Sequence, residues 1–224
     1  MDGLASLVTA CALFVGSHFL MSHPARARLV SVFGAQGFLG VYSLVSLALF
    51  GWMLWVYTQA PAGTMLWLPT DGIWIAASVL TLLASVLFVG SFLGNPAMPQ
   101  PGADALATKE PAGVFVVTRH PMMWGFALWA FAHALVAPRA EVFVFMGSFA
   151  FLALVGAAGQ DRKKAVLQGE NWQLWASRTS YWPRFSQLPK VGIRLWLAGI
   201  AFWLIASWVH GWLSLPPAGI YRWL

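Results

Sequence analysis

Five histidines stand in a chain that offers little other polar chemistry, since 59% of its 224 residues are hydrophobic and only 9% are charged. His18 lies in the first long apolar run, and His120 and His133 lie in a later one, "TRHPMMWGFALWAFAHAL". An imidazole in or near a bilayer is costly unless it binds something. These three histidines are therefore the first candidates for holding a metal or a cofactor.

The two other histidines are interpreted as residues of the membrane interface. His23 comes before a proline, past the first apolar run, and His210 stands in "WVHGW", where an aromatic belt tolerates an imidazole. The one cysteine, Cys11, excludes an intramolecular disulfide and a cysteine-rich metal site.

His120 is followed by Pro121, and proline is favoured at the first position of a helix, so His120 is the expected N-cap of a helix. Arg119 stands beside it. The unpaired N–H groups and the positive dipole end of such a helix, together with Arg119, could bind a carboxylate or phosphate. Structural capping alone would explain the same residues.

His133 comes thirteen residues after His120, which on a straight helix separates the two by about 20 Å and roughly 220°. The two cannot ligate one metal, so each needs a partner from another helix, and His18 is the candidate. Two imidazoles from different helices, without thiolates, suit the axial positions of haem b better than zinc, which takes three or four protein ligands. Arg119 or Arg26 could pair with the propionates. Alternatively, His18 and His133 bond only to backbone or serine.

The elements that would position these residues are membrane-spanning helices. So low a charge content indicates a polytopic, all-α membrane protein, with lipid as its main partner and a single domain over residues 1–224. Six segments are long and apolar enough to cross the hydrocarbon layer, and the fourth is the shortest. They are residues 4–21, 38–57, 73–93, 121–136, 142–159 and 192–213.

The basic residues predict the orientation of these spans. Alternate loops carry nearly all of them, and only Arg139 and Arg222 fall on the other side. By the positive-inside rule the basic side is cytoplasmic and both termini are periplasmic. The net charge of +6 is thus a signal of topology and does not indicate nucleic-acid binding. Trp172 and Trp175, which share a helical face in the basic segment 160–185, suggest a short helix lying against the headgroups.

Three stretches carry a resemblance to a known family. "GSHFLMSHPARARLVSVFGAQGFLGVYSLVSL" at 16–47, "TRHPMMWGFALWAFAHAL" at 118–135 and "DRKK" at 161–164 resemble the NnrU family of bacterial inner-membrane proteins. The resemblance covers nearly the whole chain. It implies a place in the bacterial inner membrane and an association with denitrification, through a nitrite or nitric oxide reductase as partner.

The same domain resembles plant zeta-carotene isomerase, a haem b enzyme that isomerises a polyene. That resemblance implies haem b as cofactor, His18 and His133 as iron ligands and an apolar, polyene-like substrate. The cysteine that can exchange onto the iron in that enzyme corresponds to Ala130 here, which puts isomerase activity in question. Because His18 lies near the cytoplasmic end of its span and His133 near the outer end, His18 with His120 is the alternative pair.

The C-terminal half also resembles isoprenylcysteine and phospholipid methyltransferases. The order "RHPMMWG", Asp161, "GENWQLW" and "YWPR" matches their motifs, although those enzymes have a paired Glu where Asp161 and Arg162 stand. This resemblance implies S-adenosylmethionine as an alternative cofactor, bound near His120 and Asp161. A third hypothesis is a non-catalytic assembly factor for a respiratory reductase.

Overall fold

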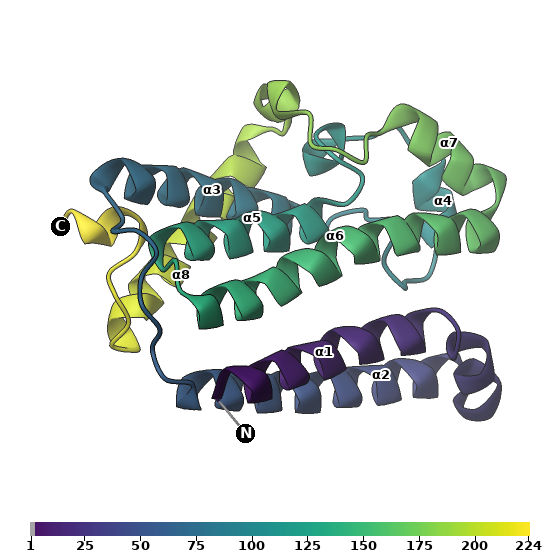
Figure 1. The fold of residues 1–224 in the computed structure, drawn as a ribbon. Coiled ribbons are helices and arrows are strands. Elements are labelled where there is room, and N and C mark those ends of the chain that lie inside the picture. The colour runs from purple at the N-terminus through teal and green to yellow at the C-terminus, as the bar shows by residue number, and fades with distance from the viewer. Residues whose placement is uncertain (1–2) are drawn as a thin grey trace.

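The computed structural model describes residues 3–224, and all the regular structure in that range is helical. Figure 1 shows the helices in chain order. The α-helices are α1 (Gly3–Ser22), α2 (Arg26–Gln59), α3 (Asp71–Gly90), α4 (Ala103–Ala107), α5 (Pro121–Val136), α6 (Ala140–Gln168), α7 (Glu170–Arg178) and α8 (Ile193–Trp212). The short 3-10 helices are η1 (Gly113–Val116) between α4 and α5, η2 (Phe185–Lys190) between α7 and α8, and η3 (Gly219–Arg222) after α8.

Five of these helices are long and apolar enough to cross a membrane: α1, α2, α3, α6 and α8. The fourth predicted span forms a helix with the predicted bounds, but α5 has only 16 residues, about 24 Å of rise against a hydrocarbon layer of about 30 Å. The prediction of an all-helical membrane protein is confirmed. The described chain has five candidate spans and one shorter apolar helix.

Helix α2 is longer than predicted because it includes the residues before position 38. Its 34 residues are interrupted at Gly34, whose φ of 69° lies in the left-handed region that favours glycine. The part before Gly34 carries Arg26 and Arg28, so the apolar part after it corresponds to the predicted span.

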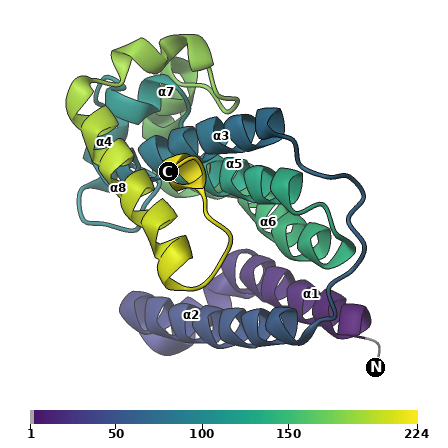
Figure 2. The same cartoon turned by 90° about the vertical axis from the view of Figure 1, so that its left-hand side faces the viewer.

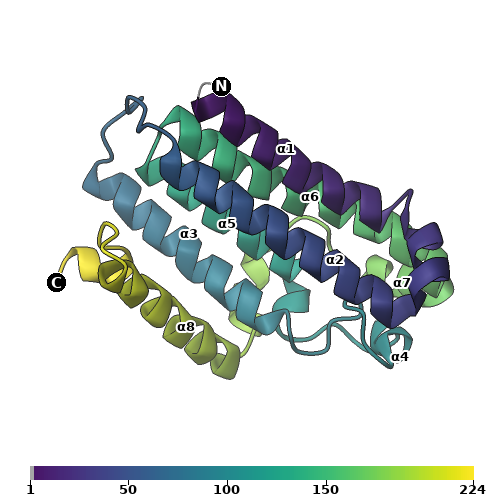
Figure 3. The same ribbon diagram turned by 90° about the horizontal axis from the view of Figure 1, so that it is seen from below.

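Helices α3, α5 and α6 lie side by side, α8 packs against α3, and the α1–α2 hairpin packs against α6 through α1 (Figures 1, 2 and 3). The turn from α1 to α2 lies at the same end of the molecule as α4 and α7, away from both ends of the chain (Figure 1). We call this end the basic end. It holds Arg26, Arg162, Lys163, Lys164 and Arg178.

Helix α7 is the short helix predicted from Trp172 and Trp175, but its tryptophans are not at a lipid interface. Each is only 2% exposed, because both pack inward against residues of η1, α4 and the core. The loop that contains Pro96 is also held in place, because Lys164 Nζ and Gln168 Nε2 donate hydrogen bonds to Pro96 O at 3.1 and 3.0 Å. The segments at the basic end thus form a packed cap over α5 and α6.

Candidate functional site

The beginning of α5 is held by the segment that follows α7. Arg119 N donates to Ser180 O at 2.8 Å, and Thr118 Oγ1 donates to Tyr181 O at 2.8 Å. His120 is the N-cap and Pro121 the first helical residue, as predicted, although the His120 side chain does not cap the helix. The imidazole is therefore available for other contacts.

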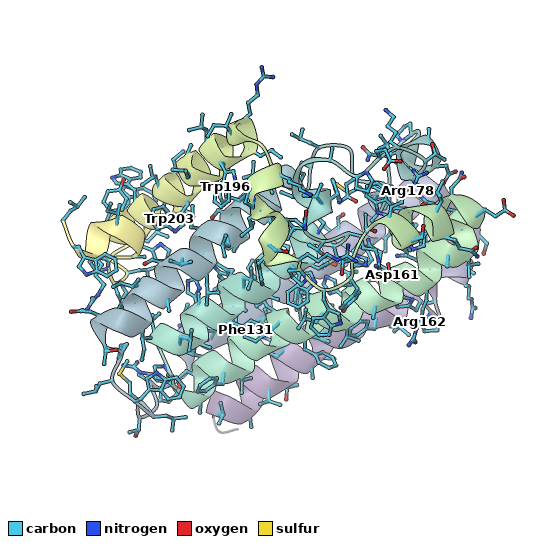
Figure 4. All side chains as sticks on the ribbon, turned by 90° about the horizontal axis from the view of Figure 1, so that it is seen from above. Phe131, Asp161, Arg162, Arg178, Trp196 and Trp203 are labelled. Carbon is cyan, nitrogen blue, oxygen red and sulfur yellow. The ribbon has the colours of Figure 1, made fainter. Side chains whose placement is uncertain are left out.

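Arg119 and His120 both contact Asp161 of α6. Arg119 Nη2 lies 2.6 Å from Asp161 Oδ2, and its Nε lies 3.0 Å from both carboxylate oxygens. The side chains of Arg119 and Asp161 are only 15% and 20% exposed, respectively, so this ion pair is largely shielded from solvent. The anion predicted to bind beside Arg119 is thus matched by a carboxylate of the chain itself. Asp161, Arg162 and Arg178 all lie toward the basic end (Figure 4).

The His120 ring is fully buried and bonded on both sides. Its Nε2 lies 2.8 Å from Asp161 Oδ1, and its Nδ1 lies 3.2 Å from Gln160 Oε1. Gln160 Nε2 in turn donates to Ala97 O at 3.4 Å, which keeps Oε1 toward the histidine. Neither nitrogen of His120 is free to ligate iron in this arrangement.

Tyr181 belongs to the same group of contacts. Its hydroxyl donates to Leu154 O at 2.6 Å, and Arg119 lies 5.7 Å from the centre of its ring. Burial and then the negative charge of Asp161 raise the pKa of the Tyr181 hydroxyl, so it stays a donor to high pH. We call Arg119, His120, Gln160, Asp161 and Tyr181 the polar cluster.

A cavity of about 340 Å³ lies between α1, α2, α5 and α6, within the size range of small-molecule sites. It adjoins the polar cluster through Gln160. Its walls are mainly aromatic and aliphatic, and its polar residues come from α1, the turn after α1, α2 and α6. The lining consists of Phe14, His18, Phe19, Ser22, His23, Tyr42, Met123, Phe126, Phe149, Leu152, Ala153, Gly156, Gln160 and Lys163.

His18 lines this cavity with one nitrogen already committed. Its Nδ1 lies 2.7 Å from Phe14 O, and because a carbonyl only accepts, Nδ1 carries the proton and Nε2 keeps its lone pair. The ring packs edge-on against Phe14 and Tyr42, with centres 4.4 and 5.4 Å away. This is the arrangement that metal-ligating histidines commonly use to fix their tautomer and orientation.

Cations gather where the cavity approaches the basic end. Lys163 and His23 line it there, and Arg26 is close enough to Lys163 to repel it. Burial, then the charges of Lys163 and Arg162, lower the pKa of His23, so it tends to stay neutral. These residues leave a local excess of positive charge beside apolar walls.

His133 lies elsewhere, on a part of α5 that faces α3 and α8. It lines a separate cavity of about 40 Å³, and its ring centre lies 6.1 Å from that of His210. The aromatic rings of Phe14, Phe149 and Trp129 form a continuous series of contacts between His18 and His133. The structure therefore does not bring the two predicted iron ligands into one cavity.

Two features of these sites were not predicted from the sequence. Lys163 and Gln160 belong to a basic helical stretch, and nothing in their spacing shows that they face a cavity. His210 was interpreted as an interfacial residue. Its proximity to His133 could have been suspected only from the depth of the two residues in the membrane, since both lie near the ends of their helices farthest from the basic end.

A comparison with protein families agrees with the resemblance seen in the motifs. The family model described as NnrU protein matches residues 6–217, nearly the whole chain. The chain belongs to the NnrU family. No curated protein and no solved structure matches it.

Proposed function

We propose that this NnrU-family protein binds haem b in the cavity between α1, α2, α5 and α6, with His18 as an axial ligand of the iron. The observation that carries the proposal is the position of His18 in a cavity of ligand size inside an apolar bundle. Bound there, haem would supply redox or isomerase-like chemistry that no side chain of the cavity supplies.

His18 suits this role because its Nδ1–H is held by Phe14 O, which leaves Nε2 as the ligating atom. On the opposite wall, Met123 of α5 could supply a thioether as second ligand, a combination known from haem proteins. This differs from ligation by His18 and His133, which would require α5 to rotate or the rings between them to move.

The propionates of haem need cations at one end of an otherwise apolar site. Lys163 lines that end of the cavity, and Arg26 lies close by. The proposed orientation therefore has the propionates toward the basic end and the ring edge among Phe14, Phe149 and Leu152.

The substrate would be apolar and would enter from the bilayer. Phe126 lines the cavity and is 38% exposed on the surface of the helix bundle, so the wall at this point separates the cavity from lipid. A polyene-like molecule fits this route. Alternatively, the haem protein would support a nitrite or nitric oxide reductase in the bacterial inner membrane, with the basic end cytoplasmic and both termini periplasmic.

A methyltransferase is the second candidate, favoured by the convergence of the methyltransferase-like motif residues. Arg119, His120 and Asp161, which lie up to 42 residues apart in sequence, meet in the polar cluster beside the cavity. In this reading the protein binds S-adenosylmethionine, and His120→Ala and Asp161→Asn each abolish that binding. An assembly factor without a cofactor would bind neither ligand.

The visible absorption spectrum of the detergent-purified protein tests the haem proposal. The protein is produced with a haem precursor, and oxidised and dithionite-reduced spectra are recorded with the haem content per chain. We expect a Soret band and sharp reduced bands at close to one haem per chain. A protein that stays colourless after haem is added contradicts the proposal and directs attention to S-adenosylmethionine.

Two variants identify the ligand. His18→Ala is expected to lose most of its haem or to show a displaced Soret band, while His133→Ala keeps the wild-type spectrum. Loss of haem in His133→Ala with an unchanged His18→Ala would assign the iron to another site. Lys163→Met, which keeps a long side chain without the charge, is expected to weaken haem binding by about tenfold or less, as for a partly exposed ion pair.

A further inference from the structure

The beginning of α2 forms a separate short helix at the basic end. Gly34 has a φ of 69° and a ψ of 171°, a combination that is essentially restricted to glycine, and the helix bends there. On a straight helix Arg26 and Phe38 would lie about 18 Å apart along the axis, yet the Arg26 guanidinium lies 5.6 Å from the centre of the Phe38 ring. Residues 26–33 therefore lie across the end of the α1–α2 hairpin instead of continuing the span (Figure 1).

This short helix combines an exposed cation with exposed apolar side chains. Arg28 is exposed, Val32 on the same helical face is 67% exposed, and Phe33 is 50% exposed. Such a helix suits the membrane–water interface, where apolar side chains enter the boundary of the acyl chains and the charged end of a long side chain reaches the headgroups. Its place in the chain agrees, because it connects two membrane-spanning segments.

Cations of α6 lie beside the same turn. His23 packs on α6 so closely that a Cβ added at Gly159 would lie 2.6 Å from its Nε2. One turn further along α6, Arg162 and Lys163 are close enough to His23 to disfavour its charged form. Arg26 is close enough to Lys163 to repel it. Positive side chains from α2 and from α6 thus meet around the α1–α2 turn.

These cations lack a counter-charge in the part of the chain that the structure describes. The ion pairs of residues 3–224 all involve other cations. Four positive side chains at this place therefore have no carboxylate partner in that range: Arg26, Arg28, Arg162 and Lys163. Like charges that lie together repel one another, so an anion from outside the chain would be attracted here.

We propose that this surface binds the phosphate of an acidic phospholipid, held by the short helix 26–33 and by Arg162. Lipid phosphates lie at the depth of an interfacial helix, and basic pockets between helices at the cytoplasmic side of a membrane bind acidic headgroups. A zwitterionic headgroup carries a cation of its own, which the cations here repel, so an anionic lipid is preferred. The site goes beyond the haem proposal, because neither Arg28 nor Arg162 lines the cavity.

Lipid retention in native mass spectrometry tests the proposal. The full-length protein, purified in detergent without haem, is mixed with equal amounts of phosphatidylglycerol and phosphatidylcholine that carry the same acyl chains. We expect one phosphatidylglycerol per chain, retained at least tenfold over phosphatidylcholine. Arg28→Gln combined with Arg162→Gln should weaken its binding more than tenfold, at about fivefold for each charge removed.

The matched control removes two other exposed charges. Arg184→Gln combined with Arg194→Gln changes the net charge by the same amount, but these residues lie before and at the start of α8, which packs against α3. This variant is expected to retain phosphatidylglycerol like the wild type. An equal loss in both double variants would show a response to net charge alone and would contradict a site at the α1–α2 turn.

A further variant tests the geometry without changing the charge. Gly34→Ala adds a methyl group that meets nothing within 4 Å but disfavours the bend, so residues 26–33 should move and phosphatidylglycerol should bind at least threefold more weakly. Gly40→Ala in the same helix, also with open space around the added group, is the control and should bind the lipid normally. Size-exclusion profiles and circular dichroism check that both variants are folded.

The remaining outcomes also decide the question. Equal retention of the two lipids, or full retention when Arg28 and Arg162 are replaced, contradicts the proposal. Displacement of the lipid by an equal concentration of glycerol phosphate would show a site for soluble phosphates and would contradict it as well. Because this assay contains no haem, its result is independent of the haem spectra. Loss of haem with unchanged lipid retention in the Arg28 and Arg162 variant would assign these charges to the haem site instead.

Discussion

Two glycines of the α3–α5–α8 core and three of the α1–α2 hairpin have opposite surroundings. In the core, a Cβ added at Gly199 would lie 2.7 Å from Val86 Cα, and one at Gly125 would lie 3.0 Å from Ala84 O. In the hairpin, a Cβ added at Gly16, Gly40 or Gly51 would meet nothing within 4 Å. Small residues let the core helices approach closely, as in other membrane bundles, whereas the three hairpin glycines make no close contact between helices.

The polar residues of the polar cluster and those of the cavity also differ in how completely they are paired. In the polar cluster Arg119, His120 and Asp161 satisfy one another, so their contacts hold the cap to the core. In the cavity beside the hairpin, His18 and Lys163 face open space. The contacts of the polar cluster are thus complete within the chain, whereas the cavity leaves His18 Nε2 and Lys163 open to the proposed ligand.

The largest expected effect is on the polar cluster. Asp161→Asn keeps the shape of the side chain but leaves the charge of Arg119 shielded from solvent without its counter-charge. We expect the free energy of unfolding to fall by about 3 kcal/mol, measured by thermal denaturation in detergent. The control is Glu110→Gln, which removes the exposed ion pair to Arg178 at 3.2 Å and should change stability by a few tenths of a kcal/mol. Equal effects of the two variants would contradict a structural role for the cluster.

A substitution at the close contact between α8 and α3 comes next. Gly199→Val would force α8 away from α3 and should cost about 2 kcal/mol by overpacking. Gly147→Val in α6 is the matched control, because that glycine is exposed and has nothing within 4 Å of an added Cβ. If both variants unfold at the same temperature, the contact of Gly199 with Val86 does not set how closely α8 packs on α3.

Removal of one hydroxyl tests the edge of the polar cluster. Tyr181→Phe loses the bond to Leu154 O and should cost about 1 kcal/mol near neutral pH. Because burial raises the pKa of Tyr181 above that of the unfolded chain, its contribution is complete below about pH 10 and is lost as the pH rises through the folded-state pKa. The stability difference between wild type and variant, measured at pH 8 and pH 11, should therefore shrink at the higher pH.

The smallest effect on stability is expected where the cavity can absorb a side chain. Gly156 lines the cavity, and an added Cβ there would meet nothing within 4 Å. Gly156→Leu should change the free energy of unfolding by less than about 1 kcal/mol while reducing haem content to less than half. Gly147→Leu on the same helix should leave both unchanged. Normal haem content in Gly156→Leu would place the ligand outside this cavity.

Much of the fold was predictable because lipid imposes simple rules on a sequence. The apolar runs predicted the five long helices and the shorter α5, and the His–Pro pair predicted the beginning of α5. The part of α2 before Gly34 was not predicted, because its first turns are too basic to be recognised as part of a membrane span. The environment of Trp172 and Trp175 was also missed, because aromatic residues suit a lipid interface and a protein core equally well.

The sequence by itself determined the class of the protein, its family and the candidate residues, since composition, hydrophobic length and local motifs are properties of the chain. Only the tertiary structure decided which candidates meet. It paired Asp161 with Arg119 and His120, placed His18 in a cavity with Lys163, and brought His133 to His210. The physical reason is that such contacts depend on the rotation and depth of each helix, which packing between helices fixes and hydrophobicity alone does not.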